Sequence, residues 1–282
     1  MVKTMEKIGI FVNSEKEYKS ALKSITEFCN KYAIEFIVEY SHEDHRIDCI
    51  DYSTIDSVIV LGGDGTILNV ARKCAKHDVN ILSINIGRLG FLSTGESTEM
   101  DKILNKYYDN DYFIENRLML NAKIRSKGHV VFESLAMNDV FVSKNGLVRT
   151  VGIDLFVDSI PASRFVADAV LVSTPTGSTA YSLSAGGPII TPEVDAILIS
   201  PVCAHSLSSR CMVVPTKSKI VLRAYQESNH LFLTVDGQVH TEFDFDNEIE
   251  ITVSKYKSKF VRLEKEYFYP RLKNKLIDWS TP

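Results

Sequence analysis

The stretch DSVIVLGGDGTILNVARKCAKHD (56–78), followed by NILSIN (80–85), decides the fold of this chain. Residues 56–61 are a continuous apolar run that ends abruptly at a cluster of glycines, which is typical of a strand buried on both faces of a sheet. Residues 67–78 suit a helix, and residues 80–85 read as a second buried strand. This order of strand, glycine turn, helix and strand predicts an open parallel sheet with helices packed on its faces.

The same alternation continues on both sides of this stretch. Residues 7–12 predict a strand, and residues 16–33 carry apolar side chains at three- and four-residue spacing, which indicates an amphipathic helix. A further strand is expected at 36–40 and a helix at 99–109. We therefore expect residues 1–112 to form an α/β, Rossmann-like domain.

The pattern changes near residue 113. Short β-branched and aromatic runs, separated by Gly, Asn, Pro and charged turns, fill residues 113–265 and predict an all-β, sandwich-like domain of two packed sheets. The tail, residues 266–282, returns to a helical spacing of its apolar residues. Because it follows the last predicted strand, we expect the C-terminal tail to pack back on the N-terminal domain.

Composition narrows the possible function classes. The chain has 282 residues and a net charge of −4, so no overall basic field attracts nucleic acid or an anionic membrane. No apolar run approaches the length of a membrane span. The five cysteines are scattered and include no C-x-x-C pair, which argues against a disulfide framework or a zinc site and favours the reducing cytoplasm.

The loop GGDGT (62–66) lies between a buried strand and the start of a helix, where open α/β sheets bind their ligands. Its glycines let the backbone approach a phosphate, and the first amides of the helix supply hydrogen-bond donors. Asp64 is the unusual residue, because a carboxylate repels phosphate unless it binds a metal or accepts a proton. Two interpretations stay open: a general base for a nucleophilic hydroxyl, or a carboxylate that caps the helix in a tight turn.

A second element is STPTGSTAYSLSAGGP (173–188), which contains a dense series of hydroxyl side chains. A turn at 175–177, followed by a helix that opens near Ser178, would direct hydroxyls and free amides into a cleft suited to ribose and phosphate. A capped helix that ends at glycine would explain only the two ends of this segment. We therefore favour a ligand site here.

Two polar motifs in the β-rich half are weaker signals. Asn138 and Asp139 interrupt a run of apolar residues, which usually marks a bulge or a turn, but an amide and a carboxylate can also clamp two vicinal hydroxyls. The motif VDGQV (235–239) is first of all a hairpin turn at Asp236 and Gly237.

Taken together, these elements resemble the NAD kinase family. GGDGT (62–66), NIGRLGFL (85–92), Asn138–Asp139 and STPTGSTAYSLSAGGP (173–188) occur in that family's order, and the resemblance continues to the tail motif YPRLKNKL. The hydroxyl-rich motif is highly specific, whereas similar Gly-Asp-Gly loops occur in diacylglycerol kinases, sphingosine kinases and phosphofructokinases. The resemblance implies an N-terminal Rossmann-like part and a C-terminal all-β part, with NAD in the cleft between them.

The resemblance also implies roles for individual residues. Asp64 would be the catalytic proton acceptor with Gly65 as a neighbouring contact, and Asn138 and Asp139 would hold the ribose of the nucleotide that is phosphorylated. The other implied NAD-binding residues are Arg149, Asp168, Thr179, Ala180, Tyr181, Ser184 and Gln238.

The expected activity is phosphoryl transfer from ATP, or from another phosphoryl donor, to the 2′-hydroxyl of the adenosine ribose of NAD, which produces NADP. We expect a divalent metal ion, Mg²⁺, to arrive with the donor, because the sequence offers no carboxylate cage for a resident ion. The resemblance further implies a homotetramer or a homodimer. Two alternatives stay open: a lipid kinase of the diacylglycerol type, and a non-catalytic module that senses NAD.

Overall fold

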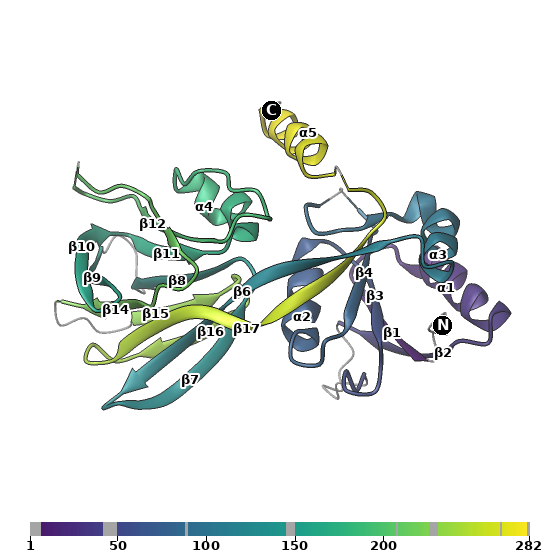
Figure 1. The fold of residues 1–282 in the computed structure, drawn as a ribbon, viewed down its shortest axis with the longest axis horizontal. Helices are drawn as coiled ribbons and strands as arrows, with labels where there is room; N and C mark the ends of the chain where they lie inside the picture. The colour runs from purple at the N-terminus through teal and green to yellow at the C-terminus, as the bar shows by residue number, and fades with distance from the viewer. Residues whose placement is uncertain are drawn as a thin grey trace. The chain divides into compact units, whose positions relative to one another are not determined.

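The chain divides into two compact units, one made of residues 1–116 and 258–282 and the other of residues 117–257. The computed structural model (Figure 1) describes residues 7–41, 50–87, 90–144, 150–206, 208–225, 231–265 and 267–280, with side chains as far as residue 276.

The first unit contains a parallel sheet, three helices that cover it and a C-terminal helix. Its elements are β1 (Lys7–Val12), α1 (Lys19–Lys31), β2 (Glu35–Tyr40), β3 (Ser57–Leu61), α2 (Asp64–Cys74), β4 (Asn80–Asn85), β5 (Gly95–Glu96), the 3₁₀ turn η1 (Ser97–Glu99), α3 (Met100–Tyr108) and α5 (Phe268–Ser280).

The strands β2, β1, β3 and β4 pair in that order and are all parallel. Every residue of β3 is buried, which explains why its sequence is a continuous apolar run instead of an alternating one. Helices α1 and α3 share one core with the sheet, and α2 lies on the opposite face (Figure 1). This arrangement brings the carboxyl ends of β1, β3 and β4 to one edge of the sheet, where α2 begins.

The second unit consists almost entirely of strands. Its elements are β6 (Phe113–Ser126), β7 (His129–Ala136), β8 (Asp139–Lys144), β9 (Val151–Val157), β10 (Ile160–Ala167), β11 (Ala169–Ser173), the 3₁₀ turn η2 (Thr176–Thr179), α4 (Tyr181–Ser184), β12 (Ala196–Val202), β13 (Met212–Pro215), β14 (Ile220–Ala224), β15 (Leu231–Val235), β16 (Val239–Phe243) and β17 (Glu248–Arg262), with β6 beginning and β17 ending in the first unit.

Two sheets build this unit. One is antiparallel with the order β13-β12-β11-β8-β15-β16, and the other contains β10-β9-β14-β17 with β6 and β7. A single apolar core joins them, because Val140 and Val172 of the first sheet belong to the same buried cluster as Ile153 and Leu222 of the second. The structure therefore confirms the predicted fold class of an α/β part followed by a β-sandwich-like part.

The chain passes from one unit to the other inside β6 and β17 and not through flexible linkers. Residues 116 and 258, where the two units meet in the sequence, lie inside continuous strands. The sequence pattern therefore does not mark these positions as domain boundaries. Helix α5 belongs to the first unit, and Arg271 in this helix donates hydrogen bonds to the carbonyl oxygens of Phe91, Ser93 and Thr94. No helix in the described part of the chain is long and apolar enough to cross a membrane.

Helix α2 begins three residues before the position that the apolar pattern predicts. Gly63 is the extended residue that precedes the helix, with φ −97° and ψ −176°, and Asp64 is the first helical residue. The apolar periodicity starts only at Ile67, so it misses the first turn. A carboxylate in that turn interacts favourably with the positive end of the helix dipole.

Candidate functional site

The glycine-rich loop is packed closely at the carboxyl end of β3. Gly62 is buried and has no room for a side chain, because a Cβ atom there would lie 2.6 Å from the Thr66 side chain. The hydroxyl of Thr66 accepts a hydrogen bond from the Asn13 amide group at 3.0 Å, which ties the loop to the residue that follows β1. The loop is therefore rigid where the backbone turns from strand into helix.

The carboxylate of Asp64 is bound to a second loop of the same unit. Its Oδ2 atom accepts a hydrogen bond from the Phe91 amide at 2.9 Å, and its Oδ1 atom accepts one from the Leu92 amide at 3.2 Å. Gly90 makes this contact possible, because a Cβ atom at Gly90 would lie 1.9 Å from Oδ1. Asp64 makes no capping hydrogen bond, so the capping interpretation is wrong. The carboxylate is instead half-buried and oriented by the backbone of residues 91–92.

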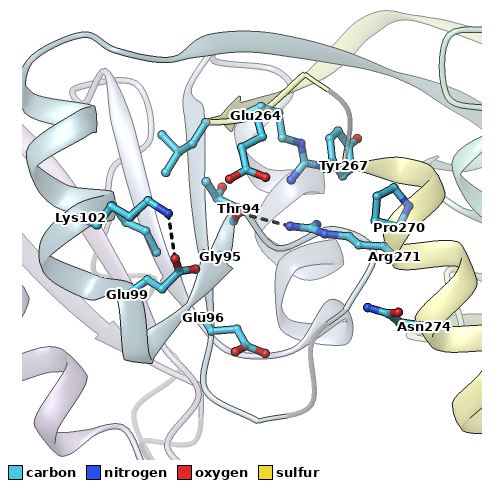
Figure 2. A pocket seen from close by; sticks show the side chains of 13 residues that line it. Thr94, Gly95, Glu96, Glu99, Lys102, Glu264, Tyr267, Pro270, Arg271 and Asn274 are labelled. Carbon is cyan, nitrogen blue, oxygen red and sulfur yellow. Dashed lines mark hydrogen bonds and ion pairs between the residues drawn. The ribbon is translucent and has the colours of Figure 1, made fainter.

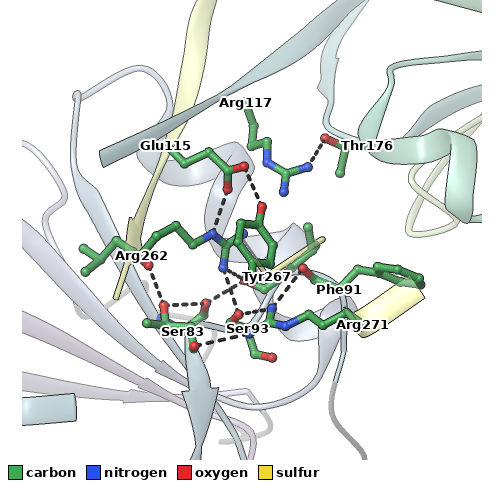
Figure 3. A network of polar contacts seen from close by, with 12 residues as sticks. Ser83, Phe91, Ser93, Glu115, Arg117, Thr176, Arg262, Tyr267 and Arg271 are labelled. Atoms are coloured by element: carbon green, nitrogen blue, oxygen red, sulfur yellow. Dashed lines mark hydrogen bonds and ion pairs between the residues drawn. The ribbon is translucent and has the colours of Figure 1, made fainter. Parts of the chain in front are cut away.

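Two arginines hold the loop that binds Asp64, as Figure 3 shows. Arg262 is 2% exposed and donates hydrogen bonds to the carbonyl oxygens of Leu92 at 3.0 Å and Ser93 at 2.8 Å. Arg271 binds the same loop from α5. Burial, reinforced by the charge of Arg262, lowers the pKa of Arg271 to about 10. The carboxylate of Glu115 compensates the charge of Arg262 by accepting a hydrogen bond from it at 2.7 Å, and it accepts another from the Tyr267 hydroxyl at 2.5 Å.

A cavity of about 300 Å³ lies beside this network (Figure 2). It contains none of the residues that the sequence analysis placed in a site. Charges of both signs line it, and Lys102 is already paired with Glu99 at 2.9 Å. Its lining does not select a ligand class.

In the second unit, Asp236 organises the segment that contains Asn138 and Asp139. Its carboxylate accepts hydrogen bonds from the amides of Met137 at 3.1 Å, Asn138 at 2.7 Å and Asp139 at 3.2 Å. Asp236 and Gly237 both have positive φ angles, 50° and 66°, so the predicted hairpin turn is confirmed. The turn therefore has a second role, because its carboxylate fixes the backbone of residues 137–139.

The carboxyl group of Asp139 is 6% exposed and has an unusual protonation equilibrium. Burial, together with the nearby charge of Asp236, raises its pKa to about 7. A carboxyl group with this pKa is present in both its neutral and its charged form near neutral pH, so it can donate or accept a hydrogen bond.

The raised pKa of Asp139 predicts a pH-dependent stability. The unfolded chain loses this proton above the ordinary pKa of 3.8, whereas the folded chain keeps it up to about pH 7, so the folded state binds more protons between these values. We expect the contribution of Asp139 to the free energy of unfolding to fall as the pH rises through this window. Urea unfolding at about pH 5 and about pH 7.5 should show a smaller fall for Asp139→Asn than for the wild-type chain.

The control for this measurement is Asp109→Asn, which changes an exposed carboxylate at the end of α3. It should keep the pH dependence of the wild-type chain. Equal pH dependence in the wild-type and Asp139→Asn chains would show that Asp139 does not titrate in this window.

The hydroxyl-rich segment packs directly on residues 137–138. The Thr174 hydroxyl donates to the Met137 carbonyl at 2.6 Å, and the Thr174 amide donates to the Asn138 carbonyl at 2.9 Å. A Cβ atom at Gly177 would lie 2.0 Å from the same Asn138 carbonyl oxygen, so only glycine fits there. The segment continues as η2 and α4, and not as the single helix expected from Ser178.

The sequence predicted that the hydroxyls of this segment line a cleft. Several of them instead make hydrogen bonds within the second unit. Ser178 donates to the Pro175 carbonyl at 2.6 Å and accepts from the Ile190 amide at 3.0 Å, and the Ser182 hydroxyl lies 3.1 Å from that of Ser200. These three serines are buried. A high local content of Ser and Thr therefore does not tell which hydroxyls bond within the protein and which can bind a ligand.

The other predicted site residues occupy varied positions. Thr179 is buried and donates to the Thr176 carbonyl at 3.2 Å, and Tyr181 is 48% exposed with its ring 5.5 Å from that of Phe141. Ala180 is half-buried in the same segment. The other exposed members of the set are Gly65, Asp168, Ser184 and Gln238. Arg149 lies outside the described residues.

The structure thus groups part of the predicted set. Asn138, Asp139 and the turn that carries Gln238 are joined through Asp236, while Asp64 belongs to the loop network of the first unit. The supporting roles of Asp236, Gly90 and Arg271 were not predicted from the sequence. Each of the three lies in a motif noted in the sequence, Asp236 in VDGQV, Gly90 in NIGRLGFL and Arg271 in YPRLKNKL, but no motif indicated the contact that its residue makes.

A carboxylate held by backbone amides in a glycine-rich loop at the carboxyl edge of a parallel sheet, in one chain with a β-sandwich, suits a nucleotide-dependent phosphotransferase. The family model of the ATP-NAD kinase N-terminal domain matches residues 1–112, and that of the ATP-NAD kinase C-terminal domain matches residues 137–263. The chain belongs to the NAD kinase family.

Individual relatives agree with this assignment. The NAD kinase of Clostridium botulinum (strain Loch Maree) is 37% identical over 273 residues, which cover 96% of each chain, and that of Thermoanaerobacter sp. (strain X514) is 36% identical over 282 residues, which cover 97% of this chain and all of the relative. Among solved structures, yeast NADH kinase complexed with NADH has a TM-score of 0.84 and 26% identity, covering 99% of this chain and 89% of its own. An NAD kinase from Archaeoglobus fulgidus in complex with ATP has the same fold, with a TM-score of 0.77 and 24% identity. The match covers 95% of this chain and 98% of the Archaeoglobus chain.

Proposed function

We propose that this chain transfers a phosphoryl group from ATP to the 2′-hydroxyl of the adenosine ribose of NAD and so produces NADP. The observation that carries the proposal is the placement of Asp64, whose carboxylate is held in a fixed orientation inside a glycine-rich loop at the edge of the sheet. Membership of the NAD kinase family over both units supports the choice of NAD as acceptor.

In the proposed reaction, Asp64 accepts the proton of the ribose hydroxyl while the hydroxyl oxygen attacks the terminal phosphorus of the donor. The bond from that phosphorus to its bridging oxygen breaks, and ADP leaves. The backbone of the glycine-rich loop and the positive end of α2 stabilise the donor phosphates. Because both oxygens of Asp64 already accept amide hydrogen bonds, the carboxylate approaches the hydroxyl in one defined orientation.

The metal ion of this reaction enters with the substrate. In the described part of the chain, no group of three or more His, Cys, Asp and Glu side chains could hold a metal ion. We propose that Mg²⁺ arrives bound to ATP, where it neutralises part of the phosphate charge.

We propose that two residues of the second unit hold the acceptor, and the family resemblance supports this choice. Asn138 and Asp139 bind the ribose hydroxyls, and their backbone is fixed by Asp236 and by the hydroxyl-rich segment. The remaining proposed NAD contacts are Gly65, Arg149, Asp168, Thr179, Ala180, Tyr181, Ser184 and Gln238.

Incubation with NAD, ATP and Mg²⁺, coupled to an NADP-specific dehydrogenase, tests this function. We expect NADP to form, and we expect NAD that lacks the adenosine 2′-hydroxyl to give no phosphorylated product. Phosphate on that analogue would show that the acceptor hydroxyl is assigned wrongly. Diacylglycerol serves as the control substrate for a lipid kinase. The matching families support neither the lipid kinase nor the non-catalytic NAD sensor.

Asn138→Ala and Asp139→Asn should each raise the KM for NAD while changing the KM for ATP little. Loss of one hydrogen bond to a buried hydroxyl costs about 1–3 kcal/mol, which corresponds to roughly a 5- to 150-fold increase in the KM for NAD. Initial rates with each substrate varied in turn will measure the two constants. A selective rise in the KM for ATP would instead place the pair at the donor.

We also propose a homo-oligomer, a tetramer or a dimer, in the cytoplasm. The family resemblance supports the oligomer, and the four described cysteines, which are all free, suit a reducing compartment. Sedimentation of the active enzyme at nanomolar concentration should give a mass above that of one chain, and a fully active monomer would contradict the oligomer.

A further inference from the structure

Lys16 places its ammonium group directly at the glycine-rich loop. A Cβ atom built on Gly63 would lie 3.2 Å from Lys16 Nζ, and one built on Gly87 would lie 3.1 Å from the same atom. These three residues follow β1, β3 and β4, which are adjacent parallel strands. The ammonium therefore lies at the edge of the sheet where open α/β proteins bind their ligands.

The ammonium group of Lys16 lies at a point where the dipole of a helix favours an anion. Gly63 is the residue before α2, so the ammonium lies beside the positive end of that helix. Within the part of the chain that the structure describes, the Lys16 side chain makes no ion pair and no hydrogen bond. The nearby carboxylate of Asp64 is engaged by the Phe91 and Leu92 amides. A half-buried cation, a helix N-terminus and two glycines thus converge on one point.

We infer that Lys16 binds the terminal phosphates of the phosphoryl donor, a nucleoside triphosphate, and stabilises the charge on the transferred group. This inference rests on the proposed function and adds a residue to it. The absence of side chains at Gly63 and Gly87 leaves the ammonium free to reach an anion on the loop. We assign the donor and not NAD, because a triphosphate carries more negative charge than the pyrophosphate of NAD and needs a fixed cation more.

The test compares Lys16→Ala, Lys16→Arg and the control Lys19→Ala, which removes an exposed lysine at the start of α1. Lys16→Ala should raise the KM for ATP about 10- to 100-fold, because a charge-assisted hydrogen bond is lost, and should change the KM for NAD less than about threefold. Lys16→Arg should recover most of the loss, and Lys19→Ala should match the wild-type chain. An unchanged KM for ATP, or a rise confined to NAD, would overturn the inference.

Titration calorimetry with ATP and Mg²⁺, in the absence of NAD, separates this inference from the proposed function. Lys16→Ala should bind ATP about 10- to 100-fold more weakly than the wild-type chain, with an unchanged thermal unfolding midpoint. If the wild-type chain makes no NADP but shows this difference, Lys16 remains a donor-binding residue and the acceptor is wrong. If NADP forms and both chains bind ATP equally, the function stands and the role of Lys16 is wrong.

Discussion

The Asp64→Asn variant is expected to turn over about 10²–10⁴-fold more slowly than the wild-type chain while still binding NAD, which is the usual size of a general-base effect. Asparagine has nearly the same shape but cannot accept the hydroxyl proton. Its NH₂ group would face one of the two amides, Phe91 or Leu92, that now donate to the carboxylate. We therefore also expect a loss of about 1–2 kcal/mol in the free energy of unfolding.

This loss of stability makes a control necessary, because Asp64 is also an anchor for residues 91–92. The kcat of the variant should be measured well below its unfolding midpoint, with NAD binding followed by calorimetry. A defect that persists when the protein is fully folded and saturated with NAD belongs to the chemistry. Near-normal kcat under these conditions would show that Asp64 only anchors the loop.

The Gly90→Ala variant should lower kcat by about 10²-fold, because misplacing a reacting group by roughly 1 Å has an effect of that size. A Cβ atom at position 90 would lie 1.9 Å from the Asp64 carboxylate, so the carboxylate or the loop must move. Gly128→Ala is the matched control, because it introduces the same methyl group in a turn with nothing within 4 Å. The control should cost some stability, since Gly128 has a φ of +83°, and should leave kcat unchanged.

A double variant tests whether Gly90 acts through Asp64. Two changes that damage the same carboxylate are not additive, so Gly90→Ala combined with Asp64→Asn should have the kcat of Asp64→Asn alone. Multiplication of the two separate effects would contradict this coupling and assign Gly90 another role.

The strands β1 to β4 of the first unit could be predicted because their signals are local, whereas the two-residue strand β5 was not predicted. The sequence of β3 is an apolar run because both faces of this strand are buried. The sequence of α1 is amphipathic because only one face of this helix is buried. The hairpin at Asp236 and Gly237 was predicted for the same reason, because the positive φ angles of such a turn favour these residue types. The start of α2 was missed because its first turn carries no apolar residue.

The sequence by itself determined the fold class, the family and the residues to examine, because periodicity, turn chemistry and motif order are properties of neighbouring residues. Only the tertiary structure decided what those residues contact. Asp64 meets Phe91 across 27 positions, Asp236 meets Asp139 across 97, and Arg271 meets Ser93 across 178. Such contacts depend on strand order and loop packing, which bring distant backbone groups within hydrogen-bond distance. No local pattern could therefore show that Asp236 fixes Asn138, or that the Lys16 ammonium lies beside Gly63 and Gly87.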